Sequence, residues 1–318
     1  MTQTDKDNSI DTHLDDEINL RELFNILWAA KKSIIIITAL FALGSVVYSL
    51  SLTNYYKSES LLSARSASET QGLSQFSGLA AMAGVNLSSS GESKAAQMIE
   101  LIKSRKFVKH LMTFDDILPS IMAAKSYDKA SQELIFDQKV YDPETKAWKR
   151  KPKENGSTTP SYLEVHEKYS GMMSISQDTR SGFISINIEH ISPVFAKEFL
   201  DLIIRESNEL LRKKDMEESV QGLEYLTSES LKTPFVEMKE SVNSLIETLM
   251  ETKMLAQIHQ DYILIKIDPP FIPEKKSKPI RSIICILGTI LGGILSVILA
   301  LIKHYFFTRE EQEVEYSD

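Results

Sequence analysis

Few residues of this chain have the type and spacing that catalysis or metal binding needs. The six histidines are scattered, and the lone cysteine, Cys285, excludes an intrachain disulfide and any site built from two thiolates. Asp115 and Asp116 are paired carboxylates, but adjacent acids need not face one site, and a solvated or capping pair is favoured. The sequence has no P-loop, H-E-x-x-H or G-x-S-x-G motif. We therefore expect no enzyme activity, catalytic residue, metal site or cofactor.

One loop combines an aromatic side chain with cations. Trp148 stands among Lys146, Lys149, Arg150 and Lys151. Such a patch can bind a phosphate or a sugar, and it can equally be a solvated loop, which is the commoner case.

Overall charge argues against one class of partner. Lysine and arginine number 36 and aspartate and glutamate 44, so the 318-residue chain has a net charge of −8. Binding to nucleic acid through bulk positive charge is not expected.

Two uncharged apolar runs, Ser33–Leu52 and Ser282–Ile302, lie near the two ends of the chain. Roughly 20 helical residues cross a hydrocarbon core of about 30 Å. Buried helices of a soluble core are the alternative, although such helices rarely lack charge over this length. A long, acidic preceding segment and the lack of a cleavage site favour an uncleaved anchor over a signal peptide. The expected organisation is a tail (1–32), a span (33–52), a central domain (53–279), a second span (282–302) and a tail (303–318).

Basic residues outside the spans predict the orientation. Lys31 and Lys32 precede the first span, and Lys303, His304 and Arg309 follow the second, which places both termini in the cytoplasm. The cluster before the second span conflicts with this assignment: Lys275, Lys276, Lys278 and Arg281. The positive-inside rule weakens for long translocated loops, so we expect an extracytoplasmic central domain.

The central domain mixes strand and helix signals. The predicted elements are a strand at Tyr55–Ala64, helices at Glu92–Met112 and about Asp128–Phe136, a β-hairpin at Met172–His190, a helical tract at about 193–260 and a strand at Tyr262–Ile267. Asp178, Ser181 and Gly182 supply the hairpin turn, Ser192 and Pro193 open the tract, and Thr233-Pro234 should break it. The last strand should pair with the first near Tyr56. The Ser/Gly/Ala-rich segment 66–91 is either a flexible loop or a contact with a neighbouring subunit.

After the proline, five apolar residues repeat at spacings of 3 and 4, which indicates a short coiled-coil-like stripe: Phe235, Met238, Val242, Leu245 and Leu249. This stripe packs either within the subunit or against a neighbouring copy.

The segment 268–281 contains four prolines, which exclude regular helix and favour a stiff connector: Pro269, Pro270, Pro273 and Pro279. In the second span, Gly288 and Gly292 form a G-x-x-x-G pattern, followed by Gly293, and glycines at this spacing let helices approach closely.

Together these stretches resemble the chain-length determinant family, the Wzz-type polysaccharide co-polymerases. The resemblance runs from Ile18 to Ile302 through INLRELFNILWAAKKSI, GLAAMAGVNLSSS, ISPVFAKEFLDLIIRESNELLR and YILIKIDPPFIPEKKSKPIRSIICILGTILGGILS. The ordered set is specific, and each piece alone is weak. The motif carries over to the four prolines, to Arg281 and to Gly288, Gly292 and Gly293, with roles in connector rigidity and in helix contact with neighbours or the polymerase.

The resemblance implies an α+β membrane protein: two transmembrane helices flank a periplasmic α/β base domain with a long extended helical region. It implies an inner-membrane homo-oligomer that sets the modal length of a surface polysaccharide, typically lipopolysaccharide O-antigen, with a Wzy-type polymerase and possible contact with lipid-linked polysaccharide. The alternative is a capsule, exopolysaccharide or common-antigen co-polymerase or export adaptor.

Overall fold

The computed structural model describes residues 20–65, 90–152, 156–232 and 236–315. The chain divides into two compact units. We call Thr53–Lys278 the central unit, and Met1–Leu52 with Pro279–Asp318 the helical unit. The Ser/Gly/Ala-rich segment and the Thr233-Pro234 break fall almost entirely outside the described residues.

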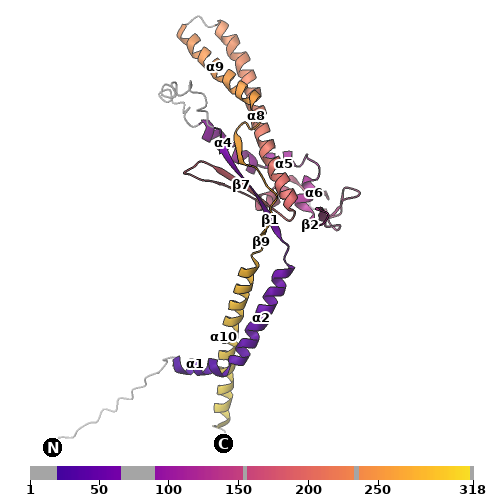
Figure 1. The fold of residues 1–318 in the computed structure, drawn as a ribbon, viewed down its shortest axis with the longest axis vertical. Helices are drawn as coiled ribbons and strands as arrows, with labels where there is room; N and C mark the ends of the chain where they lie inside the picture. Colours follow the sequence, from indigo (N-terminus) through magenta and orange to yellow (C-terminus); the bar gives the residue numbers. More distant parts are fainter. Residues whose placement is uncertain (1–19, 66–89, 153–155, 233–235, 316–318) are drawn as a thin grey trace, which may run out of the picture. The chain divides into compact units, whose positions relative to one another are not determined.

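The helical unit contains the two apolar segments. Its helices are α1 (Leu20–Ala29), α2 (Lys31–Ser51) and α10 (Arg281–Glu315). Helices α2 and α10 lie side by side and run in opposite directions (Figure 1). Lys31–Ser51 and Arg281–His304 are long and apolar enough to cross a membrane. Only 6% and 17% of their apolar windows is buried, whereas a core helix of a soluble protein is mostly buried.

The central unit is built on a five-stranded antiparallel sheet with the order β6-β7-β1-β8, in which β9 also pairs with β1. Its strands are β1 (Tyr55–Ala64), β6 (Met173–Gln177), β7 (Ile184–His190), β8 (Leu264–Asp268) and β9 (Lys276–Lys278). Two small hairpins accompany the sheet: β2 (Ala124–Tyr127) with β3 (Leu134–Phe136), and β4 (Tyr141–Asp142) with β5 (Ala147–Trp148).

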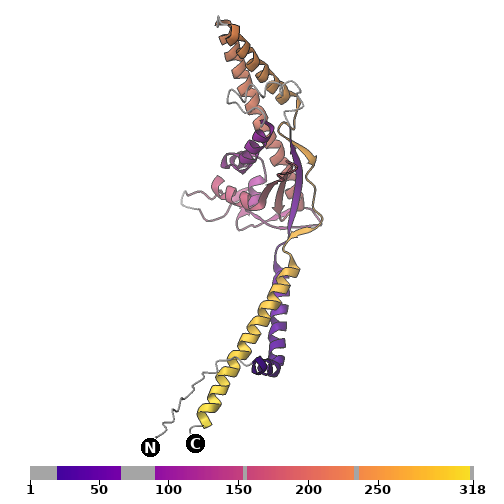
Figure 2. The ribbon, with the colours of Figure 1, turned by 90° about the vertical axis from the view of Figure 1, so that its left-hand side faces the viewer.

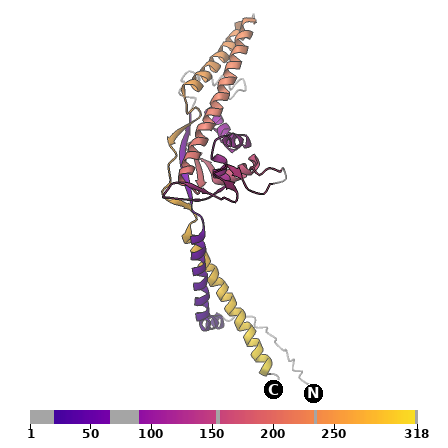
Figure 3. The ribbon, with the colours of Figure 1, turned by 90° about the vertical axis from the view of Figure 1, so that its right-hand side faces the viewer.

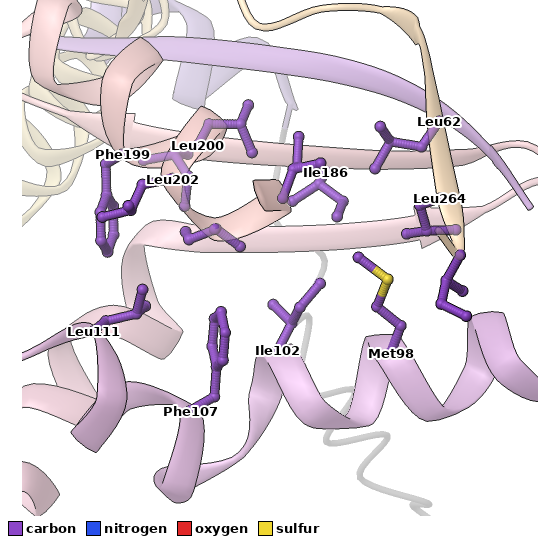
Figure 4. Packing of buried hydrophobic residues seen from close by; sticks show 14 of the residues in the cluster. Leu62, Met98, Ile102, Phe107, Leu111, Ile186, Phe199, Leu200, Leu202 and Leu264 are labelled. Carbon is purple, nitrogen blue, oxygen red and sulfur yellow. The ribbon is translucent and has the colours of Figure 1, made fainter. Parts of the chain in front are cut away.

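Helices cover one face of this sheet (Figures 2 and 3). They are α4 (Ser90–Lys103), α5 (Arg105–Leu111), α6 (Ile117–Met122), α7 (Tyr162–Met172) and α8 (Pro193–Lys232). Alternating residues of β1 and β7 point into the core, as period-2 geometry requires. The sequence predicted both segments as strands. Figure 4 shows Leu62, Ile186 and Leu264 of the strands facing Met98, Ile102 and Phe107 of α4 and α5.

Beyond the sheet, α8 pairs with α9 (Val236–Ile258) to form a helical hairpin. The Ser192 hydroxyl accepts from the Phe195 N–H at 3.1 Å, and Pro193 is the first residue of α8, as the sequence predicted. Gly222 of α8 lies so close to α9 that a Cβ there would stand 2.7 Å from Leu249 Cδ1.

Several local expectations are confirmed and two are wrong. The Met172–His190 hairpin forms, with Gly182 at φ 72°, and the last strand pairs with the first, although at Leu61–Ala64 rather than at Tyr56. The helix expected over Asp128–Phe136 does not exist: this segment is the turn of the β2–β3 hairpin and strand β3. The helix expected over Glu92–Met112 is broken at Ser104, whose side chain caps α5 by accepting from the Phe107 N–H.

Candidate functional site

The proline-rich connector is fixed along the edge of β1. Strand β8 pairs with the end of β1 and β9 pairs with its start, so the connector between them follows the same edge. The Ser58 hydroxyl donates to the Phe271 carbonyl at 2.8 Å, and the Ser60 hydroxyl donates to the Asp268 carbonyl at 2.7 Å. Proline lacks the N–H that a β-ladder uses. Two buried serine hydroxyls of β1 hold the connector by donating to its carbonyls.

Two of the connector's prolines are buried, whereas its larger apolar side chains are exposed. Pro270 and Pro273 are buried and Pro269 is exposed, whereas Phe271 and Ile272 are 50% and 52% exposed. Pro279 lies in the helical unit, followed by Arg281, the first residue of α10. The role of these residues in connector rigidity stays a prediction.

The end of the connector is also anchored by charge. Glu189 of β7 accepts from the Ser277 hydroxyl at 3.2 Å and from Lys278 Nζ at 2.5 Å. One member of the basic cluster before the second span is therefore paired with a carboxylate.

The glycines of α10 meet α2 of the same chain. A Cβ on Gly288 would stand 2.5 Å from Ser45 Cβ, and one on Gly292 would stand 2.5 Å from Phe41 Cβ. One turn further along α10, Thr38 Oγ1 and Ser296 Oγ are 3.4 Å apart. A Cβ on Gly293 would meet no atom beyond its own stretch of helix within 4 Å and would face open space. Contact of these glycines with a neighbouring subunit or a polymerase stays a prediction.

The coiled-coil-like stripe is divided by the structure. Leu249 lies against Gly222 of α8, Val242 is half-buried, and Leu245 is 54% exposed. Phe235 and the side chain of Met238 lie outside the described part of the chain. A different stripe of α9 is exposed, at a spacing of four residues: Met250 (59%), Met254 (51%) and Ile258 (64%). We call these three residues the outer stripe.

The aromatic–basic loop is mostly self-paired. Lys149 Nζ lies 2.8 Å from Asp142 Oδ2, and this hydrogen bond holds the pKa of Asp142 at about 2. Arg150 pairs with Glu164 and also donates to the carbonyls of Thr158 and Thr159. Trp148 packs against Tyr141, with ring centroids 4.9 Å apart. Lys149 and Arg150 therefore stabilise the loop itself, whereas Lys146 and Lys151 are exposed.

Sequence reasoning missed a polar cluster that joins three elements. Lys94 Nζ of α4 donates to Asp215 Oδ2 of α8 at 2.6 Å and to the Tyr262 hydroxyl, which itself donates to Asp215. Burial alone would lower the pKa of Lys94, but the hydrogen bonds to Asp215 and Tyr262 raise it above its usual value. The ammonium therefore stays charged, and its ion pair with Asp215 holds α4 against α8.

Asn208 of α8 was also missed. Its side chain accepts from the N–H groups of Ile263 and Leu264 and donates to the Leu264 carbonyl. These partners lie more than 50 residues away in sequence, so no local pattern signals them.

The described ranges hold no group of three or more His, Cys, Asp or Glu side chains that could bind a metal ion. Asp115 and Asp116 lie beside α6, where Asp116 takes a positive φ of 64° before the helix begins.

Comparison with known proteins gives two findings. Residues 16–113 match the family model "Wzz: Chain length determinant protein". A solved structure described as "full-length bacterial polysaccharide co-polymerase" is similar at 12% identity and a TM-score of 0.40, over 90% of this chain and 98% of that one. No curated protein matches. The matched segment includes α2 and β1. Residues 16–113 therefore match the Wzz chain length determinant family, and the resemblance suggested by the sequence is confirmed over this segment.

Proposed function

We propose that the protein regulates the modal chain length of a surface polysaccharide, with lipopolysaccharide O-antigen as the first candidate. It acts as a homo-oligomeric co-polymerase beside a Wzy-type polymerase in the bacterial inner membrane, as a regulator and not as an enzyme. The observation that carries this proposal is the family match over residues 16–113. Two lightly buried apolar helices support the membrane location.

Orientation is the second part of the proposal. Both termini lie in the cytoplasm and the central unit lies in the periplasm. The basic residues flanking the spans support this, and the pairing of Lys278 with Glu189 reduces the conflict from the cluster before α10.

Oligomer contacts are proposed on α9. Leu245 and the outer stripe expose apolar side chains on a helix that already has α8 as its partner within the chain. A neighbouring copy would remove this apolar surface from water, which is the usual driving force for association.

The test of function is a gel of surface lipopolysaccharide from cells with and without the gene. A sharp modal band that collapses to a random ladder, and that returns when the gene is restored, supports the proposal. An unchanged ladder contradicts the O-antigen assignment. Capsule, exopolysaccharide and common antigen from the same strains are then the polymers to size.

Orientation has its own test. In a Cys285→Ser background, Ser176→Cys places a thiol on an exposed position of β6. A membrane-impermeant maleimide should label it in cells with a permeabilised outer membrane. Labelling that requires lysis of the inner membrane would contradict the proposed orientation.

A further inference from the structure

Helix α1 changes the direction of the chain just before the first apolar helix. A single residue, Ala30, separates it from α2. The backbone stays hydrogen-bonded through this residue: the Ala30 N–H donates to the Ile26 carbonyl, and the Ile34 N–H donates to the Ala30 carbonyl, both at 3.0 Å. Figures 1 and 2 show that α1 lies across the end of α2 instead of extending its axis. These two hydrogen bonds hold the chain at the corner.

Two large aromatic side chains of α1 are mostly exposed. Phe24 and Trp28 are 62% and 61% exposed, and their rings stack with centroids 5.9 Å apart. Ile26 and Leu27 are half-buried, and α1 contacts both α2 and α10. Helices α2 and α10 thus cover only part of the apolar surface of α1.

A cation lies directly beside this aromatic pair. Lys31 Nζ stands 4.4 Å from the centroid of the Trp28 ring, and Lys32 follows it. Tryptophan and lysine together are typical of the boundary between hydrocarbon and water, where the ring meets the acyl chains and the ammonium reaches the headgroups.

The exposed aromatic pair stands near exposed apolar residues of α2, which lipid covers if α2 crosses the membrane. Ile35 and Ile36 of α2 are each 65% exposed, and they begin within one turn of Lys31 and Lys32. We propose that α1 is an interfacial helix: Phe24 and Trp28 insert into the membrane at headgroup depth, and Lys31 and Lys32 bind the phosphates of anionic lipids. This rests on the proposed membrane insertion of α2. The helix fixes the depth of the first span.

Trp28 is a built-in probe, because Trp148 is the only other tryptophan. The Trp148→Phe full-length chain is reconstituted in phosphatidylcholine vesicles with 20% phosphatidylglycerol that carry bromine or nitroxide labels at known depths. We expect Trp28 emission to be quenched at least two-fold more strongly by labels near the headgroups than by labels at chain ends. Quenching as weak as that of Trp148 in the matched Trp28→Phe chain would overturn the proposal.

A third reporter separates this inference from the insertion of α2. Leu43→Trp, with Trp28 and Trp148 both changed to Phe, places the probe on a lipid-exposed residue of α2 (69% exposed). Deep quenching of this probe with no quenching of Trp28 leaves the span intact and rejects the interfacial helix. If neither probe is quenched, both assignments fail.

Two further outcomes decide the nature of the contact. Trp28 emission that shifts with the protein-to-lipid ratio, without lipid quenching, would mean that a second copy covers the aromatics, against the proposal. Removing phosphatidylglycerol should weaken the shallow quenching of Trp28, and should have much less effect in the Lys31→Gln, Lys32→Gln variant. Equal sensitivity of both chains would reject the headgroup role of the two lysines.

Discussion

Asn208 holds the start of β8 to α8 through three hydrogen bonds, all buried. The variant Asn208→Ala leaves two N–H groups and one carbonyl without their partner. We expect the free energy of unfolding to fall by about 2 to 4 kcal/mol, since each buried group left unpaired costs about 1 to 3 kcal/mol and rearrangement recovers part of it. Denaturation of the Trp28→Phe chain, followed by Trp148 fluorescence, measures this change.

The matched control is Ser207→Ala, one residue earlier. Ser207 is also buried, but its hydroxyl donates only to carbonyls of its own helix, Ile203 and Ile204. These carbonyls keep helical partners, so the control should lose markedly less stability. Equal losses would show that Asn208 contributes through packing and not by joining β8 to α8.

His190 makes the central unit sensitive to acid. Its Nε2 lies 3.0 Å from the Ser120 carbonyl and its Nδ1 accepts from the Ser192 N–H, so the neutral ring satisfies both contacts. Burial lowers the pKa of His190 to about 4 from the usual 6.5, despite these backbone hydrogen bonds. A depressed histidine pKa means that the unfolded chain takes up a proton first as the pH falls.

The stability that His190 contributes is therefore complete above about pH 6.5 and is lost as the pH falls toward 4. The difference of 2.5 units (6.5 − 4) corresponds to about 3 kcal/mol at 1.36 kcal/mol per unit. Unfolding measured at steps from pH 7.5 to pH 4.5 should show this slope, and His190→Gln should flatten it. The same slope in both chains would assign the acid sensitivity to other groups.

At the scale of elements, the seam between α2 and α10 gives adjacent glycines opposite roles. Gly292→Leu drives a side chain into Phe41 Cβ, which cannot move without its backbone, whereas Gly293→Leu enters open space. In a Cys285→Ser background, Thr38→Cys and Ser296→Cys replace side chains whose oxygens are 3.4 Å apart. We expect oxidation to cross-link these cysteines, and Gly292→Leu to reduce the cross-link several-fold.

Gly293→Leu is the control and should keep the cross-link at the level of the parent chain. If this variant nevertheless changes oligomer size, Gly293 contacts a neighbouring copy, as the family resemblance implies. A cross-link that survives Gly292→Leu would mean that the seam tolerates a side chain and that the close approach is not required.

Sequence patterns predicted these elements where one face is clearly apolar. Strand character in Tyr55–Ala64, alternation in the Met172–His190 hairpin and the turn at Asp178–Gly182 predicted β1, β6 and β7 correctly. The helix predicted over Asp128–Phe136 failed because Asp128 accepts from the Ala130 N–H and the Ser131 hydroxyl, and Gln132 takes a φ of 57°. These hydrogen bonds form a turn, and the spacing of apolar residues alone does not predict such a turn.

Contacts between distant segments limited the prediction of the candidate site. The G-x-x-x-G pattern indicated close helix packing but not its partner, which is α2 of the same chain. The prolines indicated a stiff connector, but Ser58 and Ser60, which hold it, belong to a strand more than 200 residues earlier. Serines at alternate positions of a strand do not indicate in the sequence that they will bind a distant segment.

At the scale of the whole molecule, the outer stripe of α9 should decide oligomer size. Met250→Glu with Met254→Glu places two charges where apolar side chains are more than half exposed, so the single chain should tolerate the change. A copy packed over this stripe would have to bury both carboxylates, which is costly without partners. We expect the purified detergent-solubilised protein to shift to smaller species by light scattering, and the polysaccharide ladder to lose its modal band.

Asn243→Glu is the matched control, because it adds a charge to an exposed polar position of the same helix. It should keep both the oligomer and the modal band. The two readouts also separate assembly from function. Smaller species with an unchanged modal band would show that chain length does not depend on the α9 contact. An unchanged oligomer with a lost band would instead make the outer stripe a contact for the polymer or the polymerase, because the added charges would then act on chain length without altering how the copies associate.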